Sequence, residues 1–442
     1  MKILVVGSGA REHIIAETLK KSRHNPDLIV YGNRVNPGMK ELSVDYHVGD
    51  LMNLEEIKSF AKKHSDLDFA VIGPDDQIAN GTADILETIG IKSMAPKKSL
   101  ARLESSKSFT RDLLAKYNIL GNPDFKVFKK DDSNVAEEIE KYITENLEGE
   151  FVIKADGLCG GKGVKVVGDH LRDEKEGVAY AMECLLEDGF VIVEEKFVGQ
   201  EFSLMSFVDG KTVVDMPPIQ DHKRAYDGDK GPNTGGMGTY SYPENLPFLT
   251  DQDLVDAHNI TVEVMKALEI ECGEFFKGIM YGGFIVTKKG VKLIEYNARF
   301  GDPEAMNALA ILETDFVDVC QAVIEGTLAD LEVKFAKQAT VCKYVVPEGY
   351  PDNPIKNEKV EIGEIPFGCK MYYASVDKKE DGIYMSTSRA IAFVGVADTI
   401  EQAEQIAQKG VESVKGKVFF RRDIGTQALI DLRVKMMEEI RR

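Results

Sequence analysis

Short apolar runs alternate with amphipathic stretches through the first part of the chain. The runs Ile3–Val6, Leu28–Tyr31 and Phe69–Ile72 each have the length of a buried strand. Between them, residues 12–21 and 54–64 carry apolar side chains at helical spacing. Strands that alternate with helices in this way predict a parallel sheet with right-handed crossovers.

The pattern changes after a predicted boundary near Pro96–Ala101. The segment from about Asp124 holds predicted strands around a glycine-rich turn, in the order Phe151–Lys154, Gly157–Gly163, Val164–Val167 and Phe190–Glu195. Two strands joined by such a turn are typical of a hairpin. This second unit is therefore predicted to be α+β.

The rest of the chain mixes helices and short strands. The pattern predicts a helix at Asp251–Leu268, strands at Gly283–Thr287 and Val291–Glu295, and a helix-rich stretch at Glu304–Glu325. From about Ala336 on we expect short strands and one clear helix, Thr399–Val414.

Composition narrows the class of protein. The 442 residues are 43% hydrophobic, enough for several cores, and carry a net charge of −19. That charge speaks against nucleic acid or an anionic membrane as a partner, although local basic groups can still bind small anions. The six cysteines include no CxxC pair, and no apolar run reaches the roughly 18 residues of a membrane span. We expect a cytoplasmic protein with reduced thiols, starting with a strand rather than a signal peptide.

The central segment Gln220–Gly238, QDHKRAYDGDKGPNTGGMG, has no helical or strand period. Five of its residues are glycine and six are charged, and Pro232 would break a helix. The segment is either a flexible linker or a binding loop. Its mixture of donors, acceptors and both charge signs around close-approaching backbone favours the binding loop.

Two glycine-rich turns are candidates for binding phosphate groups. Residues 7–12, GSGARE, follow a strand and open a helix, but Glu12 stands where a dinucleotide fingerprint needs a third glycine. They predict a smaller phosphate-bearing ligand, or a tight turn with nothing bound. The turn 157–163 is not a Walker A motif. Lys154, inside an apolar run, needs a counter-charge that a phosphate would supply, whereas Lys162 could be a solvated charge.

Two groups of polar residues lie at predicted strand ends. Glu194, Glu195 and Glu201 form either a functional carboxylate group or a solvated acidic edge. Glu295 and Asn297 alternate on one strand, so their side chains share a face. Two oxygen ligands in this arrangement suit Mg²⁺, with Arg299 next on the same face to clamp a phosphoryl group. The alternative is a buried polar strand end.

Taken together, these elements resemble the ATP-grasp superfamily and, within it, the phosphoribosylamine–glycine ligase family. The most specific segments are the central loop and EYNARFGDPE at 295–304. Further segments that fit are GSGAREH at 7–13, LESSK at 103–107, VIKADGLCGGKGV at 152–164, EGYP at 348–351 and FRRDIG at 420–425.

The resemblance implies an α/β and α+β multidomain protein with an ATP-grasp fold. Residues 1–103 would form an amino-terminal parallel-sheet domain and residues 104–335 the ATP-grasp domain, with a smaller lid lobe at about 124–195. Residues 336–442 would form a carboxyl-terminal α+β domain. The implied reaction phosphorylates the carboxylate of glycine with ATP, after which the amine of 5-phospho-D-ribosylamine attacks the glycyl phosphate.

The resemblance also implies roles for particular residues. It assigns ATP to Lys107, Lys154, Gly157, Gly160, Gly161, Lys162, Gly163, Glu194, Glu195, Phe197 and Glu201. It assigns Mg²⁺ or Mn²⁺ to Glu295 and Asn297, and catalytic roles to Arg299, Lys154 and Asp221. Substrates would meet Gly9, Arg11, Glu12, His13, Asp221, Lys223, Asn233, Thr234, Gly235, Arg299, Asp302 and Pro303. The partners are these small molecules, and we expect a monomer or weak dimer.

Several positions depart from the family pattern. Residues 73–78, GPDDQI, replace a GPEAPL-like stretch, and Cys159 replaces a small apolar residue in the lid. Late in the chain, residues 373–376 (YASV) and 386–389 (STSR) replace HAGT and TSGGR patterns. The strand at 282–287 offers no acid, so we expect only two protein ligands for the metal. Two alternatives stay open: a ligase with a different amine acceptor, and a nucleotide-binding regulator without turnover.

Overall fold

The computed structural model describes residues 1–64, 66–160 and 163–442. It begins with a five-stranded sheet in the order β3-β2-β1-β4-β5, in which all pairs are parallel. The strands are β1 Lys2–Val6, β2 Asp27–Gly32, β3 Ser43–Val48, β4 Phe69–Ile72 and β5 Lys92–Met94. The predicted parallel sheet is confirmed. Strand β3 was missed because it is a half-exposed edge strand without an apolar run.

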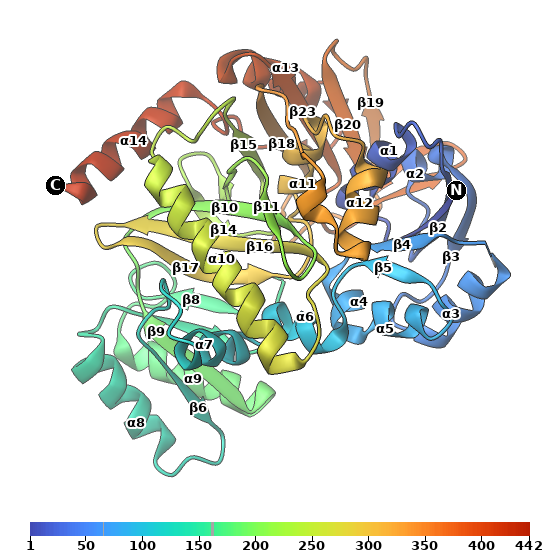
Figure 1. Cartoon of the computed structure of the whole chain (residues 1–442). Helices are drawn as coiled ribbons and strands as arrows, with labels where there is room; N and C mark the ends of the chain where they lie inside the picture. Colours follow the sequence, from blue (N-terminus) through green and yellow to red (C-terminus); the bar gives the residue numbers. More distant parts are fainter. Residues whose placement is uncertain (65, 161–162) are drawn as a thin grey trace.

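Helices cover both faces of this sheet, as expected for a parallel sheet. Ile3 and Val5 of β1 pack with Ile14 of α1, while the intervening Leu4 and Val6 pack on the opposite face. The helices are α1 Ala10–Lys20, α2 Pro37–Leu42, α3 Leu54–Lys63, α4 Asp75–Asn80 and α5 Thr82–Glu87. This domain lies at the right of the molecule in Figure 1.

Helices α6 Lys98–Ser105 and α7 Lys107–Lys116 lead into a small lobe. The lobe is an antiparallel sheet in the order β6-β9-β7-β8, with bounds Phe125–Lys129, Phe190–Glu195, Phe151–Ala155 and Val164–Val166. Helix α8 Val135–Lys141, the π-helical turn η1 Tyr142–Asn146 and helix α9 Glu174–Asp188 pack with it. The predicted hairpin, now β7–β8, is confirmed. The lobe projects to the lower left in Figure 1.

The larger lobe is built on an antiparallel sheet in the order β11-β10-β16-β17. Its strands are β10 Gly199–Val208, β11 Val213–Asp215, β16 Gly278–Thr287 and β17 Gly290–Asn297. Helix α10 Asp251–Cys272, capped by Thr250, crosses this sheet in Figure 1. Helices α11 Glu304–Ala310 and α12 Phe316–Glu325 and the 3-10 turn η2 Leu328–Asp330 follow.

The central segment, residues 220–238, contains strands that its sequence pattern does not reveal; it is called the substrate loop below, after the role that the sequence predicts for it. They are β12 Gln220–Asp221, β13 Arg224–Tyr226 and β14 Lys230–Asn233, and β15 Gly238–Ser241 starts at its end. Strands β13 and β14 pair as a hairpin. The sequence did not predict these strands, because short, largely polar strands show no apolar alternation.

The carboxyl-terminal part contributes most of a six-stranded sheet, β12-β15-β18-β23-β20 with β25 beside β18. A second sheet has the order β21-β22-β19-β24. The bounds are β18 Ala339–Pro347, β19 Lys359–Ile362, β20 Cys369–Tyr373, β21 Val376–Lys379, β22 Gly382–Met385, β23 Ile391–Ala397, β24 Val414–Lys415 and β25 Val418–Phe419, with helix α13 Ile400–Glu412. Because β12 and β15 belong to the substrate loop and its continuation, this sheet joins the loop to the last part of the chain.

A second helix ends the chain, α14 Gln427–Arg441, where only one helix was expected after residue 336. That expectation was wrong, because α14 buries few apolar side chains, among them Leu429, Ile430 and Met437, and so carries a weak periodic signal. It is the red helix that leads to the carboxyl terminus in Figure 1.

No helix among the described residues is long and apolar enough to cross a bilayer. The six cysteines all lie within the described residues and carry free thiols.

Candidate functional site

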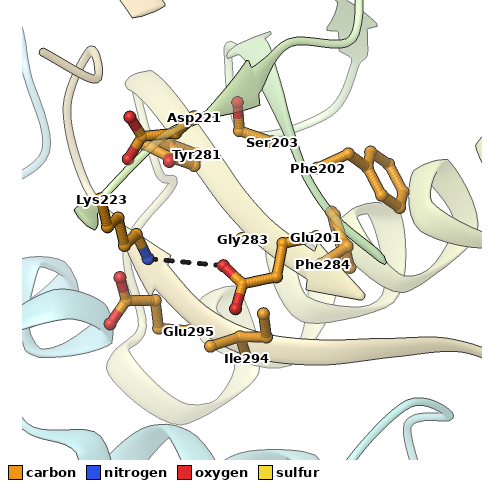
Figure 2. A pocket seen from close by; sticks show the side chains of 10 residues that line it. All are labelled: Glu201, Phe202, Ser203, Asp221, Lys223, Tyr281, Gly283, Phe284, Ile294 and Glu295. Carbon is orange, nitrogen blue, oxygen red and sulfur yellow. Dashed lines mark ion pairs between the residues drawn. The ribbon is translucent and has the colours of Figure 1, made fainter. Parts of the chain in front are cut away.

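The substrate loop meets the larger lobe's sheet at a small cavity of about 20 Å³ (the first cavity). Strands β10, β16 and β17 form its walls, and the loop contributes Asp221 and Lys223. The lining residues, drawn in Figure 2, are Glu201, Phe202, Ser203, Asp221, Lys223, Tyr281, Gly283, Phe284, Ile294 and Glu295. Four of the ten side chains are ionisable acids or lysine, so the cavity is a site for charged groups.

Lys223 lies among carboxylates in this cavity. Its Nζ is 3.8 Å from Oε2 of Glu201, and Figure 2 shows it extending between Glu201 and Glu295. Burial lowers the pKa of Lys223, but the charges of Glu201, Glu295 and Asp221 outweigh burial and raise it overall. Lys223 is therefore an ammonium ion at neutral pH, with its charge available to an anionic ligand.

Glu295 and Asp221, two acids that line the first cavity, differ in the direction in which their pKa is shifted. Burial raises the pKa of Glu295, but Lys223 and Lys154 outweigh it and leave the pKa lowered. For Asp221, burial and the neighbouring Glu304 raise the pKa well above the usual range. Glu295 thus stays ionised and can bind a cation, whereas Asp221 binds its proton more strongly than an ordinary aspartate.

Glu295 and Asn297 lie two residues apart on β17, opposite Gly283 and Tyr281 of β16. An ionised carboxylate and an amide oxygen suit Mg²⁺, which completes its shell with water and phosphate. Within the part of the chain that the structure describes, no set of three His, Cys, Asp or Glu side chains converges at Glu295. The donors present therefore fit a metal ion with two protein ligands.

Arg299 is held by a glutamate that the sequence analysis did not single out. Arg299 Nη2 lies 3.0 Å from Oε1 of Glu104 and donates to Oδ1 of Asn297 at 3.1 Å. The other oxygen of Glu104 accepts from the Ala298 backbone N–H at 2.7 Å. Glu104 belongs to the LESSK segment, which was noted for Lys107. The segment was the available signal, but it could not predict the buried pair between Glu104 of α6 and Arg299, two residues beyond β17.

Lys154 has its counter-charge within the protein. It forms an ion pair with Glu194, which also accepts two hydrogen bonds from Arg111, at 2.7 Å from Nε and 3.1 Å from Nη2. Glu194 is only 2% exposed, so the interpretation as a solvated edge is wrong for this residue. Arg111 and Lys154 outweigh burial and lower the pKa of Glu194. Arg111 was missed because its partner is 83 residues away in sequence.

Other residues assigned to ATP lie around this ion pair. Lys107 donates from Nζ to the Gly157 carbonyl at 2.7 Å, which ties α7 to the glycine turn. Gly163 accepts from the Ala155 N–H at 2.8 Å. Gly160 has a positive φ of 54°, which glycine adopts without strain. Gly161 and Lys162 lie outside the described residues.

Glu195 at the end of β9, Phe197 between the two strands and Glu201 of β10 follow Glu194 along the chain. One carboxylate oxygen of Glu195 accepts from the Asp124 N–H at 3.2 Å. The Phe197 ring lies 5.8 Å from the Lys292 ammonium. Glu201 is exposed and is the partner of Lys223 described above.

A second, larger cavity of about 430 Å³ (the second cavity) lies between the amino-terminal sheet and the carboxyl-terminal part. It is lined by Ser8, Gly9, Arg11, Glu12, Asn33, Arg34, Asp50, Leu51, Met52, Pro74, Asp76, Gln77, Asp302, Tyr344, Ala374, Ser375, Ser388 and Arg389. Three arginines in one cavity suit an anionic ligand. All three divergent segments, at 73–78, 373–376 and 386–389, contribute to its lining.

The glycine turn at the start of α1 binds a carboxylate of the protein itself, that of Glu12. The Gly9 N–H donates to Oε2 of Glu12 at 2.6 Å, and Arg11 Nε donates to Oε1 at 2.8 Å. A Cβ at Gly7 would lie 2.6 Å from Cγ of Glu12, so glycine is needed to accommodate this side chain. The carboxylate of Glu12 thus occupies the N-terminus of α1. The sequence had predicted either a ligand phosphate at this place or a tight turn with nothing bound.

Six predicted substrate residues lie outside both linings, namely His13, Asn233, Thr234, Gly235, Arg299 and Pro303. His13 is stacked on Tyr373, whose N–H donates to its Nδ1 at 3.0 Å, and burial lowers the pKa of His13 to about 4. Thr234 donates from Oγ1 to the Lys223 carbonyl at 2.8 Å. Asn233 contacts His170 at 3.3 Å, and Pro303 precedes α11.

Gly235 and Asp302 share hydrogen bonds with one arginine, Arg389, which lines the second cavity. Arg389 Nη1 donates to the Gly235 carbonyl at 2.7 Å and to the Asp302 carbonyl at 2.8 Å. Asp302 accepts from the Tyr344 hydroxyl at 2.6 Å. The substrate loop therefore lines the first cavity with Asp221 and Lys223, and its Gly235 contacts Arg389 in the lining of the second.

Three family models match the chain in succession. They are the phosphoribosylglycinamide synthetase N domain at residues 1–104, its ATP-grasp (A) domain at 105–305 and its C domain at 340–427. Among curated proteins, the phosphoribosylamine–glycine ligase of Methanosarcina barkeri is 49% identical and covers all of both chains. That of Methanocaldococcus jannaschii is 47% identical, again over all of both chains.

Solved structures agree on the fold. The phosphoribosylamine–glycine ligase of Thermotoga maritima superposes with a TM-score of 0.78 at 26% identity, covering 96% of this chain and all of that one. The biotin carboxylase of Campylobacter jejuni, solved with an ATP analogue, gives a TM-score of 0.72 at 15% identity, covering 99% and 95%. At that identity the second likeness concerns the fold alone.

The ion pairs of Glu194 with Arg111 and Lys154 should contribute to the free energy of unfolding. Replacing Glu194 with Ala leaves Arg111 and Lys154 buried without their carboxylate, so we expect it to lower the free energy of unfolding by about 3–5 kcal/mol. Glu195→Ala is the matched control, because the neighbouring carboxylate is more exposed and accepts only a backbone hydrogen bond. Thermal melting of the two variants measures the difference. Equal melting temperatures would show that the pair contributes nothing.

Proposed function

The chain belongs to the phosphoribosylglycinamide synthetase family, and we propose that it joins glycine to 5-phospho-D-ribosylamine with ATP, in purine biosynthesis. It is an ATP-dependent ligase. The observation that carries this function is the succession of three family models from residue 1 to residue 427, together with full-length relatives at 44–49% identity. The products are glycinamide ribonucleotide, ADP and phosphate.

The chemistry explains why both cavities are needed. A carboxylate is a poor acyl donor, so glycine first receives the γ-phosphoryl group of ATP and becomes glycyl phosphate. The amine of phosphoribosylamine then attacks the acyl carbon, and phosphate leaves with the electrons of the broken C–O bond. Phosphoryl transfer requires positioning and charge neutralisation more than covalent help from the protein.

Glu295 and Asn297 would hold Mg²⁺ or Mn²⁺. When bound, such an ion neutralises phosphate charge during transfer. Their common face on β17 and the ionised state of Glu295 support this assignment. Arg299, held by Glu104 and adjacent to Asn297, is placed to stabilise the transferring phosphoryl group.

Lys107, Lys154 and the glycine turn would receive the phosphates of ATP, and Glu194, Glu195, Phe197 and Glu201 its nucleoside. Lys154 reaches this position already paired with Glu194, so it acts as a fixed donor. Lys223, charged and beside Glu295, would orient the carboxylate of glycine toward the γ-phosphate. Asp221, with its raised pKa, lies next to it and would receive a proton released by the attacking amine.

The second cavity would take phosphoribosylamine. Arg11, Arg34 and Arg389 complement its 5-phosphate, and the turn that carries Gly9 and Glu12 forms the facing wall. Asp302 and Gly235, linked through Arg389, lie where the sugar amine would approach the first cavity.

Further parts of the proposal concern the molecule as a whole. We propose domains at 1–103, 104–335 and 336–442, with a lid lobe at about 124–195. A cytoplasmic location and a monomer or weak dimer fit an enzyme whose partners are small molecules. The second candidate function is a ligase with a different amine acceptor, which the divergent segments around the second cavity favour.

Substrate omission separates these two functions. We expect ADP release to require ATP, glycine and phosphoribosylamine together, because glycyl phosphate is consumed only when the amine is present. The measurement is a coupled ADP assay with each substrate left out in turn. Sustained turnover without phosphoribosylamine, at the rate of the full mixture, would contradict the function proposed first.

Glu295→Ala tests the metal assignment. Loss of one of two protein ligands should lower kcat by at least about a hundredfold, since metal stabilisation of the transferring phosphoryl group is worth several kcal/mol. Binding of ADP without metal, measured by calorimetry, should change little. Glu263→Ala, on the exposed side of α10, is the control. A Glu295→Ala enzyme with ordinary kcat would refute the assignment.

Cys159 offers a test of the lid. Its Sγ lies 3.7 Å from the Gly157 carbonyl and would crowd any Cβ at Gly163, so an added alkyl group should distort the glycine turn. Alkylation should slow ADP release in the wild type and leave a Cys159→Ala enzyme unaffected. Mass spectrometry establishes the extent of modification. Full activity with Cys159 completely alkylated would show that the turn tolerates the group.

A further inference from the structure

The tip of the β13–β14 hairpin is bound to the end of the chain rather than free in solvent. Asp229, at the tip, accepts from Nη1 of Arg421 at 2.9 Å and also forms an ion pair with Arg433 of α14. Its φ of 53° is in the left-handed region, which an aspartate adopts at some cost. The two guanidinium groups thus hold an otherwise unfavourable turn in one conformation.

Arg421 joins the tip to the backbone around it. Its side chain is fully buried and donates to Asp423 from Nε at 2.9 Å and from Nη2 at 2.7 Å. It also donates from Nη1 to the Arg224 carbonyl at 3.0 Å. A buried guanidinium between two carboxylates is costly to disturb, so this arrangement is rigid.

The neighbouring tip residues are bound in the same way. The Gly228 N–H donates to Oδ2 of Asp423 at 2.8 Å, and the Arg422 N–H donates to Oδ1 of Asp227 at 2.8 Å. The Tyr226 ring lies 5.8 Å from that of Phe419. Every residue from 226 to 229 therefore contacts the segment 419–423 or α14.

The other end of the hairpin carries the charged groups of the first cavity. Strand β13 begins immediately after Lys223, and Thr234 at the end of β14 returns to the Lys223 carbonyl through its N–H at 2.7 Å and its hydroxyl at 2.8 Å. Lys223 is thus joined to both strands at the base of the hairpin. A shift of the whole hairpin would therefore carry Lys223 with it and move its ammonium group relative to Glu201 and Glu295.

Helix α14 connects this hairpin to the larger lobe. Its last turn forms an ion pair between Arg441 and Asp253 of α10 at 2.5 Å. Its Met436 contacts Gln200 of β10. The C-domain family model ends at residue 427, where α14 begins. The helix therefore lies outside the matched segments, yet it contacts both the substrate loop and the lobe that would bind ATP.

We propose that α14 positions the substrate loop, through Arg433, Asp229 and Arg421, and thereby sets the affinity for glycine. The inference rests on the proposed function, in which Lys223 orients the glycine carboxylate. Arg433 and Arg421 are positioning residues, since they lie at the far end of the hairpin and act through it.

Replacing Arg433 with Ala tests the proposal in the full-length enzyme. Asp229 keeps Arg421, so the protein should fold, but the tip loses its link to α14. We expect KM for glycine to rise about tenfold, equivalent to roughly 1.4 kcal/mol, with kcat lowered less than threefold. The dissociation constant of ADP, measured by calorimetry, should stay unchanged. Arg433→Lys restores the charge and should recover part of the lost affinity.

Arg441→Ala is the matched control. It removes an arginine–aspartate pair from the same helix, but its partner Asp253 lies on α10 and not on the substrate loop. Both variants should lower the melting temperature. Arg433→Ala breaks the contact with the loop directly and should raise KM for glycine more than Arg441→Ala, which loosens only the far end of α14. An unchanged KM in Arg433→Ala would overturn the positioning role.

The wild-type baseline distinguishes this inference from the proposed function. A wild-type enzyme that does not convert glycine and phosphoribosylamine refutes the function. An active wild type with an unaffected Arg433→Ala variant refutes only the role of α14.

Discussion

One buried carboxylate, Glu194, holds the two cations that join the small lobe to the sheet of the larger lobe. It is the last residue but one of β9 in the small lobe and pairs with Arg111 of α7 and Lys154 of β7. Both cations also donate to β17: Arg111 to the Leu293 and Ile294 carbonyls at 3.1 and 2.7 Å, and Lys154 to the Ile294 carbonyl at 2.9 Å. Ile294 directly precedes Glu295. The charge that fixes the small lobe therefore also fixes the strand that presents the candidate metal ligands.

This arrangement explains how an acidic protein can act on anionic substrates. The net charge of −19 would repel phosphates at long range, but that field is screened within about 10 Å at ordinary ionic strength. Within the candidate site, Arg111, Lys154 and Arg299 come from separate parts of the chain and are held by the buried carboxylates of Glu194 and Glu104. Each cation keeps its charge and its orientation without needing the ligand to order it.

The sequence predicted those features that depend on neighbouring residues. The alternation of runs such as Ile3–Val6 with helices predicted the parallel sheet, and the glycine turn before Val164 predicted the hairpin β7–β8. The two-residue spacing of Glu295 and Asn297 placed them on one face. The partners of Lys154 and Arg299 could not be predicted, because Glu194 and Glu104 meet them only after folding. The β13–β14 hairpin and α14 were missed because polar contacts, not apolar periodicity, hold them.

Two glycines of the substrate loop, Gly235 and Gly236, allow close packing, whereas the number of glycines in the loop suggests flexibility. A Cβ at Gly236 would lie 2.7 Å from Oδ1 of Asp221 and 2.8 Å from the Pro303 ring, and one at Gly235 would lie 3.2 Å from the Arg389 guanidinium. Both glycines therefore allow the loop to pack tightly between the two cavities. The loop is also bound at its tip to the end of the chain, through Asp229 and the guanidinium groups of Arg421 and Arg433. Packing at its glycines and ion pairs at its tip therefore hold the loop in one conformation, so that its glycines serve close approach and not flexibility.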